Sequence, residues 1–291
     1  MIYTIHNDKL ICKISSEGAE IRSLVDKNSG REYIWQIDPE IWGSTSPVLF
    51  PAIGKIKSGK IEYQGQTFDM PKHGIIRHNG DLDFTQYADD HCSFKLESSN
   101  QTLKQYPFQF FFEVDYKLIE NRLVMTYFIK NKDNIDMYFN CGGHTAYACP
   151  LNGNIRLSDY VIEFPKTVNL KAATLGKTGY LSNKMRDIKT DGNLLSLSKT
   201  LFDEDALIFK GLDVDWVRLR HRDAQKGVMV KFKDYPNLAL WAKPGADYVC
   251  IEPWLGLPDH ENESVDITQK TTYKQLPPES GMSIAIETLV E

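Results

Sequence analysis

The sequence predicts an all-β fold, a large antiparallel β-sandwich. Apolar residues alternate with polar ones along many short stretches, as is typical of strands with one buried face. No stretch of about 11 residues has the apolar spacing of an amphipathic helix, so the helices needed to connect parallel strands are missing and an α/β fold is disfavoured. Pro and Gly are scattered and no repeat occurs, so we expect one domain over residues 1–291, with residues 166–199 as a loop-like insertion on it.

The clearest expected element is a long β-hairpin. The even-numbered positions of residues 108–118 are all apolar, and the positions between them are mostly polar. Residues 120–121 then predict a turn, and the alternation resumes over residues 123–129. The same alternation predicts strands at residues 92–97, 228–232, 238–241, 248–251 and 283–289. Short helical turns are expected near residues 101–106 and 199–205.

Charge and cysteine content restrict the possible partners. The chain has 34 Lys and Arg against 39 Asp and Glu, a net charge of −5, which disfavours nucleic-acid binding because such proteins concentrate positive charge. The first residues lack the pattern of a secretory signal, and no uncharged apolar run approaches the ~20 residues that cross a bilayer. The 5 cysteines are odd in number and irregularly spaced, which fits a reducing compartment. We expect a soluble, cytoplasmic protein with no membrane partner.

The first segment with candidate chemistry surrounds His144. If residues 138–144 are extended, His144 shares one face with Gly142, Asn140 and Tyr138, and a glycine beside a histidine leaves room for a ligand against the backbone. A histidine in a strand is more often a hydrogen-bonded structural residue than a catalyst, so this segment alone does not decide between the two roles.

Two further segments carry candidate groups. Glu252 follows apolar residues in an expected strand, and a carboxylate there is costly to bury unless it is paired or used in chemistry. Lys72, His73 and Arg77 make residues 71–78 a densely cationic loop, which by itself is typical of a solvated turn. Trp241 and Trp254 are interpreted as core or edge residues rather than sugar platforms.

A zinc site is another interpretation of the first segment. Cys141, His144 and Cys149 offer three possible zinc ligands. An extended backbone directs Cys141 and His144 to opposite faces, and no second ligand pair of standard spacing follows. We therefore expect no metal ion.

Four motifs, in this order and spacing, resemble those of the aldose 1-epimerases (galactose mutarotases), especially the LacX-like branch. They are LFPAIGKI, HGIIRH, GGHTAY and CIEPWLGLPD, and the similarity extends to the closing SGMSIAIETLV. The family has a very large antiparallel β-sandwich with a concave sugar-binding face. The resemblance implies an isomerase that interconverts the α and β anomers of a sugar without a cofactor.

By position, His144 corresponds to the catalytic acid of the family and Glu252 to its catalytic base. A pyranose opens when a proton leaves the C1 hydroxyl and another reaches the ring oxygen. The resemblance assigns the first transfer to Glu252 and the second to His144, which requires an ionised Glu252 and a protonated His144.

The resemblance also assigns sugar-binding residues. His73 corresponds to a histidine that holds the ring oxygen or a hydroxyl, and Arg77 closes the same motif. Asp205 corresponds more loosely to an acidic residue that binds sugar hydroxyls. Lys55 stands where many mutarotases have arginine, and a lysine lacks the planar fork of that side chain.

Three functions follow from these observations. The favoured one is mutarotation of a free hexose. The second is 1-epimerisation of a hexose 6-phosphate, which needs an anion-binding pocket that Lys55, Arg77 and Lys72 could supply. The third is carbohydrate binding without turnover, which the presence of both an acid and a base disfavours.

Overall fold

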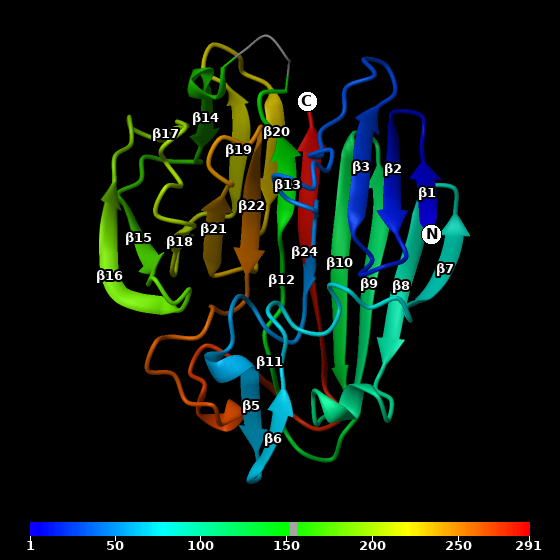
Figure 1. Cartoon of the computed structure of the whole chain (residues 1–291). Helices are drawn as coiled ribbons and strands as arrows, with labels where there is room; N and C mark the ends of the chain where they lie inside the picture. Colours follow the sequence, from blue (N-terminus) through cyan, green and yellow to red (C-terminus); the bar gives the residue numbers. More distant parts are fainter. Residues whose placement is uncertain (152–155) are drawn as a thin grey trace.

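The computed structural model describes residues 1–151 and 156–291, and antiparallel strands make up nearly all of its regular secondary structure (Figure 1). This confirms the predicted all-β class. One large sheet has nine strands, which in spatial order are β17 (Leu194–Ser196), β14 (Tyr160–Glu163), β19 (Trp216–His221), β20 (Gly227–Lys231), β24 (Gly281–Val290), β10 (Arg122–Asn131), β9 (Phe110–Ile119), β8 (His91–Glu97) and β7 (Asp83–Ala88).

A second large sheet has eight strands and carries the functional site described below. Seven of them are, in spatial order, β16 (Leu181–Ile188), β15 (Leu170–Leu175), β18 (Leu207–Phe209), β21 (Asn237–Trp241), β22 (Tyr248–Trp254), β12 (Gly142–Gly143) and β4 (Val48–Leu49). The eighth, β13 (Thr145–Ala148), also pairs with β22. Every residue of β22 is buried, because both faces of this strand are covered.

Smaller elements flank the two large sheets. They are a three-stranded sheet of β1 (Ile2–His6), β2 (Leu10–Ser15) and β3 (Ile21–Asp26), and the pairs β5 (Lys60–Tyr63) with β6 (Gln66–Asp69) and β11 (Met137–Phe139) with β23 (Lys274–Leu276). The helices of the described residues are the short 3₁₀ segments η1 (Lys57–Gly59), η2 (Thr102–Lys104), η3 (Leu157–Asp159) and η4 (Ile267–Gln269). None of the described helices is long and apolar enough to cross a membrane.

The predicted hairpin is present as β9 and β10. Ile119 pairs with Arg122, which leaves the two-residue turn at the expected place, and Glu120 in that turn has a φ of 53°. The apolar positions of β9 are buried and the intervening ones lie closer to solvent. The side chains of Phe112 and Tyr127 pack together across the hairpin in the main core.

The two large sheets pack face to face, and a glycine makes this contact possible. A Cβ atom on Gly143 of β12 would lie 2.7 Å from Ile286 of β24. Nearby, the hydroxyl of Tyr147 on β13 lies 2.6 Å from that of Thr288 on β24. The glycine expected to leave space for a ligand is Gly142, and that expectation was wrong: a Cβ atom there would lie 2.7 Å from the main-chain oxygen of Pro253 and 2.7 Å from the side chain of Trp254, so β22 takes the space.

Residues 199–205 form successive hydrogen-bonded turns, as expected. Two other sequence-based expectations about local structure need correction. Residues 166–199 are not a loop-like insertion: they contain β15, β16 and β17 and so contribute to both large sheets. Residues 138–144 are not one extended strand, because β11 ends at Phe139, β12 covers two glycines, and His144 lies between β12 and β13. Near residues 101–106, the expected helical turn is present as η2.

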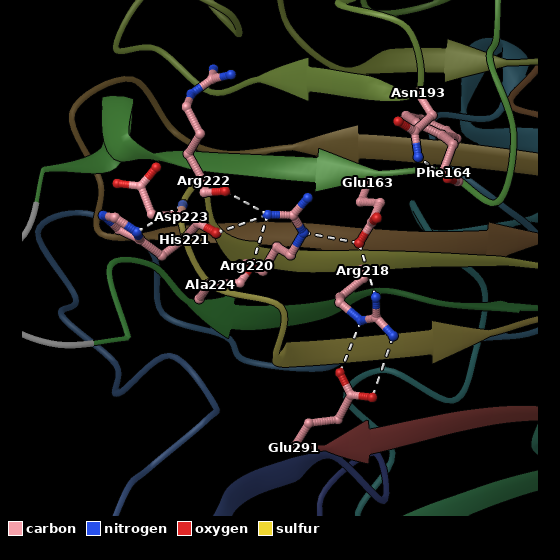
Figure 2. Close-up of polar contacts among 10 residues, drawn as sticks. All are labelled: Glu163, Phe164, Asn193, Arg218, Arg220, His221, Arg222, Asp223, Ala224 and Glu291. Atoms are coloured by element: carbon pink, nitrogen blue, oxygen red, sulfur yellow. Dashed lines mark hydrogen bonds and ion pairs between the residues drawn. The ribbon is translucent and has the colours of Figure 1, made fainter.

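A buried arginine joins β14, β19 and the turn after β19 (Figure 2). Arg220 Nε donates to the carboxylate of Glu163 at 2.9 Å. Its Nη1 donates to three main-chain carbonyl groups, those of His221, Arg222 and Ala224. The planar guanidinium thus provides the hydrogen-bond donor for three main-chain carbonyl groups at the end of β19.

Candidate active site

All six site residues proposed from the sequence line a single cavity of about 260 Å³ on the eight-stranded sheet; they are Lys55, His73, Arg77, His144, Asp205 and Glu252. They come from segments that are far apart along the chain. Trp42, Lys72, Trp241 and Trp254 complete much of the wall. Trp42 was missed because its loop has no periodicity or motif, and the two other tryptophans line the cavity rather than serve only as core residues.

His144 and Glu252 lie at the floor of the cavity. His144 Nε2 is 3.3 Å from Glu252 Oε2, and the two residues are only 8% and 1% exposed. The register of β13 and β22 explains this proximity. Thr145 pairs with Ile251, and because the strands are antiparallel, His144 before Thr145 lies opposite Glu252 after Ile251. A titratable base and a titratable acid are thus side by side in a site with little water.

Burial dominates the electrostatics of this pair. Desolvation, with a smaller contribution from the nearby Arg77 charge, lowers the pKa of His144 to about 3. Desolvation also raises the pKa of Glu252 well above its usual value, although Lys72 opposes that shift. Both shifts favour the uncharged forms, a carboxylic acid at Glu252 and a neutral imidazole at His144, and in this form the pair holds its transferable proton on the carboxylic acid. These shifts run opposite to the ionised pair expected from the sequence.

His73 occupies a tight backbone position next to this pair. Its φ is 70°, and its Nδ1 accepts a hydrogen bond from the amide of Gly54 at 3.2 Å. A neutral imidazole that accepts at Nδ1 carries its proton on Nε2. Burial lowers the pKa of His73 well below the usual value, which keeps the ring in this neutral form. Its ring centroid lies 5.4 Å from that of His144, so His73 can offer a hydrogen-bond donor to a ligand beside the pair.

Two cations, Lys72 and Arg77, face the cavity from the same loop. Arg77 is half-buried, and among the described residues its Nε has no hydrogen-bond partner although it is shielded from solvent. Lys72 is exposed and forms no ion pair within the described part of the chain. A buried donor without a partner is costly, so a ligand oxygen would stabilise Arg77.

Lys55 lines the cavity, but its amine is used by the protein. Lys55 Nζ donates to the carbonyl of Thr178 at 2.7 Å and lies 4.7 Å from the centre of the Tyr180 ring. Thr178 and Tyr180 lie at the tip of the β15–β16 hairpin, and Gly179 of the same tip lines the cavity. The lysine therefore ties this tip to the opposite wall.

Asp205 stands at the rim, just before β18. It is exposed and has a φ of 74°, a conformation in which aspartate is more common than most residues. One carboxylate oxygen accepts from the amide of Ala206 at 2.8 Å, and the carboxylate retains capacity to accept from a ligand hydroxyl.

A possible metal-binding group overlaps the acid–base pair. Among the described residues, His144, Cys250 and Glu252 bring one nitrogen, one sulfur and one oxygen atom within 4.8 Å of one another. A metal would bind the thiolate form, and burial, together with the Glu252 charge, raises the pKa of the Cys250 thiol well above its usual value. The surroundings therefore favour proton transfer over metal binding. This set differs from the Cys141-based one considered from the sequence.

Comparison with known proteins gives consistent matches. The family model described as aldose 1-epimerase matches residues 1–273. The plasmid and chromosomal forms of protein LacX from Lactococcus lactis subsp. lactis are each 29% identical to this chain, with 88% of both chains covered.

Two solved structures extend the similarity to three dimensions. A galactose mutarotase related enzyme from Lactobacillus acidophilus is 32% identical, with a TM-score of 0.93 over 100% of this chain and 97% of that one. A galactose mutarotase-like protein from Lactobacillus casei ATCC 334 is 28% identical, with a TM-score of 0.92 and full coverage of both chains.

Proposed function

Because the chain belongs to the aldose 1-epimerase family, we propose that it interconverts the α and β anomers of a free hexose. The observation that carries this proposal is the 3.3 Å separation of His144 Nε2 and Glu252 Oε2 at the floor of a cavity. The cavity, at about 260 Å³, lies just below the usual range of small-molecule pockets, roughly 300–1,000 Å³. Its size supports a single monosaccharide as substrate rather than an oligosaccharide.

The reaction needs one proton acceptor and one proton donor. Glu252 removes the proton of the C1 hydroxyl, the C1–O5 bond breaks, and O5 takes the bond's electron pair and a proton from His144. The open-chain aldehyde rotates about C1–C2, and the two transfers run in reverse on the other face of the carbonyl. Positioned acid–base groups contribute about 10²–10⁴-fold to such a step.

The number of protons on His144 and Glu252 is compatible with this cycle. The neutral pair holds one proton on Glu252, and moving it to His144 gives the ionised pair that opens the ring. Ring opening then returns the pair to its neutral form. No cofactor is required, since every proton comes from the pair or the sugar.

The remaining cavity residues have roles in holding the sugar. His73 offers an Nε2 donor, Arg77 offers a guanidinium nitrogen that has no partner among the described residues, and Asp205 offers an acceptor at the rim. We assign Lys55 a different role from direct sugar binding, because its amine already contacts Thr178 and Tyr180.

One observation favours a second candidate, a hexose 6-phosphate as substrate. Lys72 lines the cavity beside Arg77, so two cations without an ion-pair partner among the described residues face its interior. A phosphate carries about two negative charges near neutral pH and is stabilised by such groups. The rim carboxylate of Asp205 opposes an anion, which keeps the neutral hexose as our first choice.

Polarimetry of freshly dissolved sugars tests the proposal. The approach of α-glucose, α-galactose and glucose 6-phosphate to anomeric equilibrium is followed with and without the protein. We expect acceleration for at least one free hexose. If no sugar mutarotates faster with the protein, catalysis is excluded and carbohydrate binding without turnover becomes the better interpretation.

We also propose a cytoplasmic location. The described cysteines are all free and buried, namely Cys12, Cys92, Cys141, Cys149 and Cys250. Unpaired thiols are typical of a reducing compartment. Cell fractionation with an antibody against the chain would test this, and recovery in the extracellular fraction would contradict it.

A further inference from the structure

The imidazole of His144 is unusual in how its orientation is fixed. A histidine that transfers protons commonly has its second ring nitrogen held by a hydrogen bond, which sets both tautomer and ring plane. Here Nδ1 of His144 is shielded from solvent and has no hydrogen-bond partner of good geometry among the described residues, although the ring interacts with the main chain of His144 itself. Other contacts must therefore hold the ring.

Aromatic rings surround the imidazole instead. The indole of Trp42 stacks on it, with ring centroids 5.3 Å apart and planes inclined by 29°. Trp241 meets it edge-on at 5.9 Å, and His73 does so at 5.4 Å. The stacked contact covers a face of the imidazole, and the edge contacts limit its rotation.

The loop that carries Trp42 is itself anchored. The amide of Trp42 donates to the carbonyl of Asp38 at 2.8 Å, and the indole N–H of Trp35 donates to the Trp42 carbonyl at 3.4 Å. Lys243, from the turn after β21, donates to the carbonyl of Ile41 at 2.6 Å. The backbone on either side of Trp42 is thus fixed to neighbouring parts of the fold.

We propose that Trp42 is a positioning residue for His144, holding its imidazole in the plane from which Nε2 exchanges protons with Glu252 and the sugar. This inference rests on the proposed mutarotase function. Trp42 carries no charge, so it acts by contact and by keeping water from the covered face of the ring. Low water content is one cause of the lowered pKa of His144, which therefore reports on this contact.

Other groups near His144 also affect its protonation and must stay unchanged in a test. They are Cys250 and Glu252 on β22, Asp205 before β18, and Lys72, His73 and Arg77 in the loop of residues 71–78. A substitution at Trp42 alters none of these charges. A change in the pKa of His144 in such a variant would therefore reflect loss of the indole.

The first measurement compares Trp42→Leu with Trp42→Phe by polarimetry. We expect Trp42→Leu to lower kcat about 10-fold, part of the ~10²–10⁴-fold that a positioned acid–base group supplies. KM should change much less, and Trp42→Phe should recover most of kcat because a phenyl ring can still stack. If KM rises while kcat is unchanged, Trp42 is a sugar platform and the proposal is wrong.

The second measurement is histidine NMR titration between about pH 5 and 7, around the ordinary histidine pKa, with the His144 signal assigned by its loss in His144→Gln. In the unmodified chain the His144 signal should not titrate in this range. In Trp42→Leu it should begin to titrate as water reaches the ring, and in Trp42→Phe it should not. If it stays unchanged in Trp42→Leu, the proposal is overturned.

Trp254→Leu is the matched control, because Trp254 lines the cavity and has no ring contact with His144 among the described pairs. It should change KM and leave the His144 titration as it is. If the unmodified protein shows no mutarotation, the proposed function fails, and the titration of Trp42→Leu still decides the positioning role. If mutarotation occurs and Trp42→Leu leaves either kcat or the titration unchanged, the positioning role alone fails.

Discussion

His144 Nε2 lies 3.3 Å from Glu252 Oε2, and the register of two adjacent strands sets this distance. Thr145 of β13 pairs with Ile251 of β22 and Gly142 of β12 pairs with Trp254, so His144 and Glu252 lie between two paired positions of adjacent segments. The proposed acid and base are thus fixed by main-chain pairing rather than by a mobile loop. Such fixed geometry is what proton transfer to and from a bound sugar requires.

The first prediction concerns the two groups of this pair. His144→Gln and Glu252→Gln should each lower kcat by at least ~10², because each removes a proton donor or acceptor while keeping side-chain size and some hydrogen bonding. Both variants should retain the far-UV circular dichroism of the unmodified protein. Near-full activity in either folded variant would contradict the assigned role.

The second prediction concerns the pH dependence of kcat/KM, which should differ from that of a histidine and a glutamate with ordinary pKa values. In its active form the His144–Glu252 pair holds one proton. The acidic and basic limbs of the rate profile therefore report apparent pKa values of the pair, not of either residue alone. Because the pKa of His144 is lowered to about 3, protonation of the neutral pair occurs only in strong acid. Because the pKa of Glu252 is raised, loss of the last proton is delayed to higher pH.

We therefore expect kcat/KM to stay flat between about pH 4.5 and 6.5, the ordinary pKa values of the two side-chain types, and to decline only above this range. Stopped polarimetric assays in buffers of constant ionic strength would measure it. A bell-shaped curve centred between those two values would indicate an ordinary ionised pair and contradict the neutral one.

Much of the fold follows from local sequence pattern, whereas the irregular segments do not. The β9–β10 hairpin was predictable because its alternation is long and its turn short. The β15 and β16 strands were mistaken for a loop because only some of their positions are buried, and an exposed strand has a weak apolar period. The break before His144 was missed because a two-glycine strand leaves no side-chain pattern.

The cavity shows the same division. Motif resemblance identified His73, Arg77, His144, Asp205 and Glu252, and all of them line it. The position of Trp42 depends on how an irregular loop folds over the eight-stranded sheet, and no periodicity in the sequence indicates that. The engagement of the Lys55 amine by a distant hairpin tip is a tertiary contact and was equally invisible in the sequence.

The third prediction separates free from phosphorylated substrate. We expect kcat/KM to be higher for a free hexose than for glucose 6-phosphate and to depend weakly on salt, since a neutral sugar gains nothing from long-range attraction. Lys72→Met should then change the free-hexose value by less than ~3-fold, as expected for a solvated surface charge. A preference for glucose 6-phosphate that disappears in Lys72→Met or Arg77→Ala would establish the second candidate instead.

The fourth prediction concerns Arg220, which is only 6% exposed and bonds Glu163 and three carbonyl groups (Figure 2). Arg220→Ala should lower the free energy of unfolding by about 3 kcal/mol, since it leaves three main-chain acceptors without their donor and removes one of the two arginines that bond the partly buried carboxylate of Glu163. Arg222→Ala is the control, because among the described residues that exposed side chain donates only to Ser196, and its loss should cost under about 0.5 kcal/mol. Urea unfolding measures both, and equal stabilities of the two variants would refute the role of Arg220.

The last prediction uses His73 to test the electrostatics of the site through stability. Its pKa is lowered by burial, so below about pH 6.5 the unfolded chain binds a proton that the folded chain excludes, and the free energy of unfolding falls as pH falls. The lowered pKa of His144 makes the free energy of unfolding fall with pH in the same way. The raised pKa of Glu252 has the opposite effect above the ordinary pKa of that side chain.

His73→Asn keeps an acceptor for the Gly54 amide and tolerates the positive φ. Urea unfolding between about pH 5 and 6.5 should show that the free energy of unfolding falls less steeply with decreasing pH in His73→Asn than in the unmodified protein. The two slopes should differ by up to about 1.4 kcal/mol per pH unit. An unchanged slope would mean that His73 is protonated in the folded chain, and its Nδ1 could not then accept from Gly54.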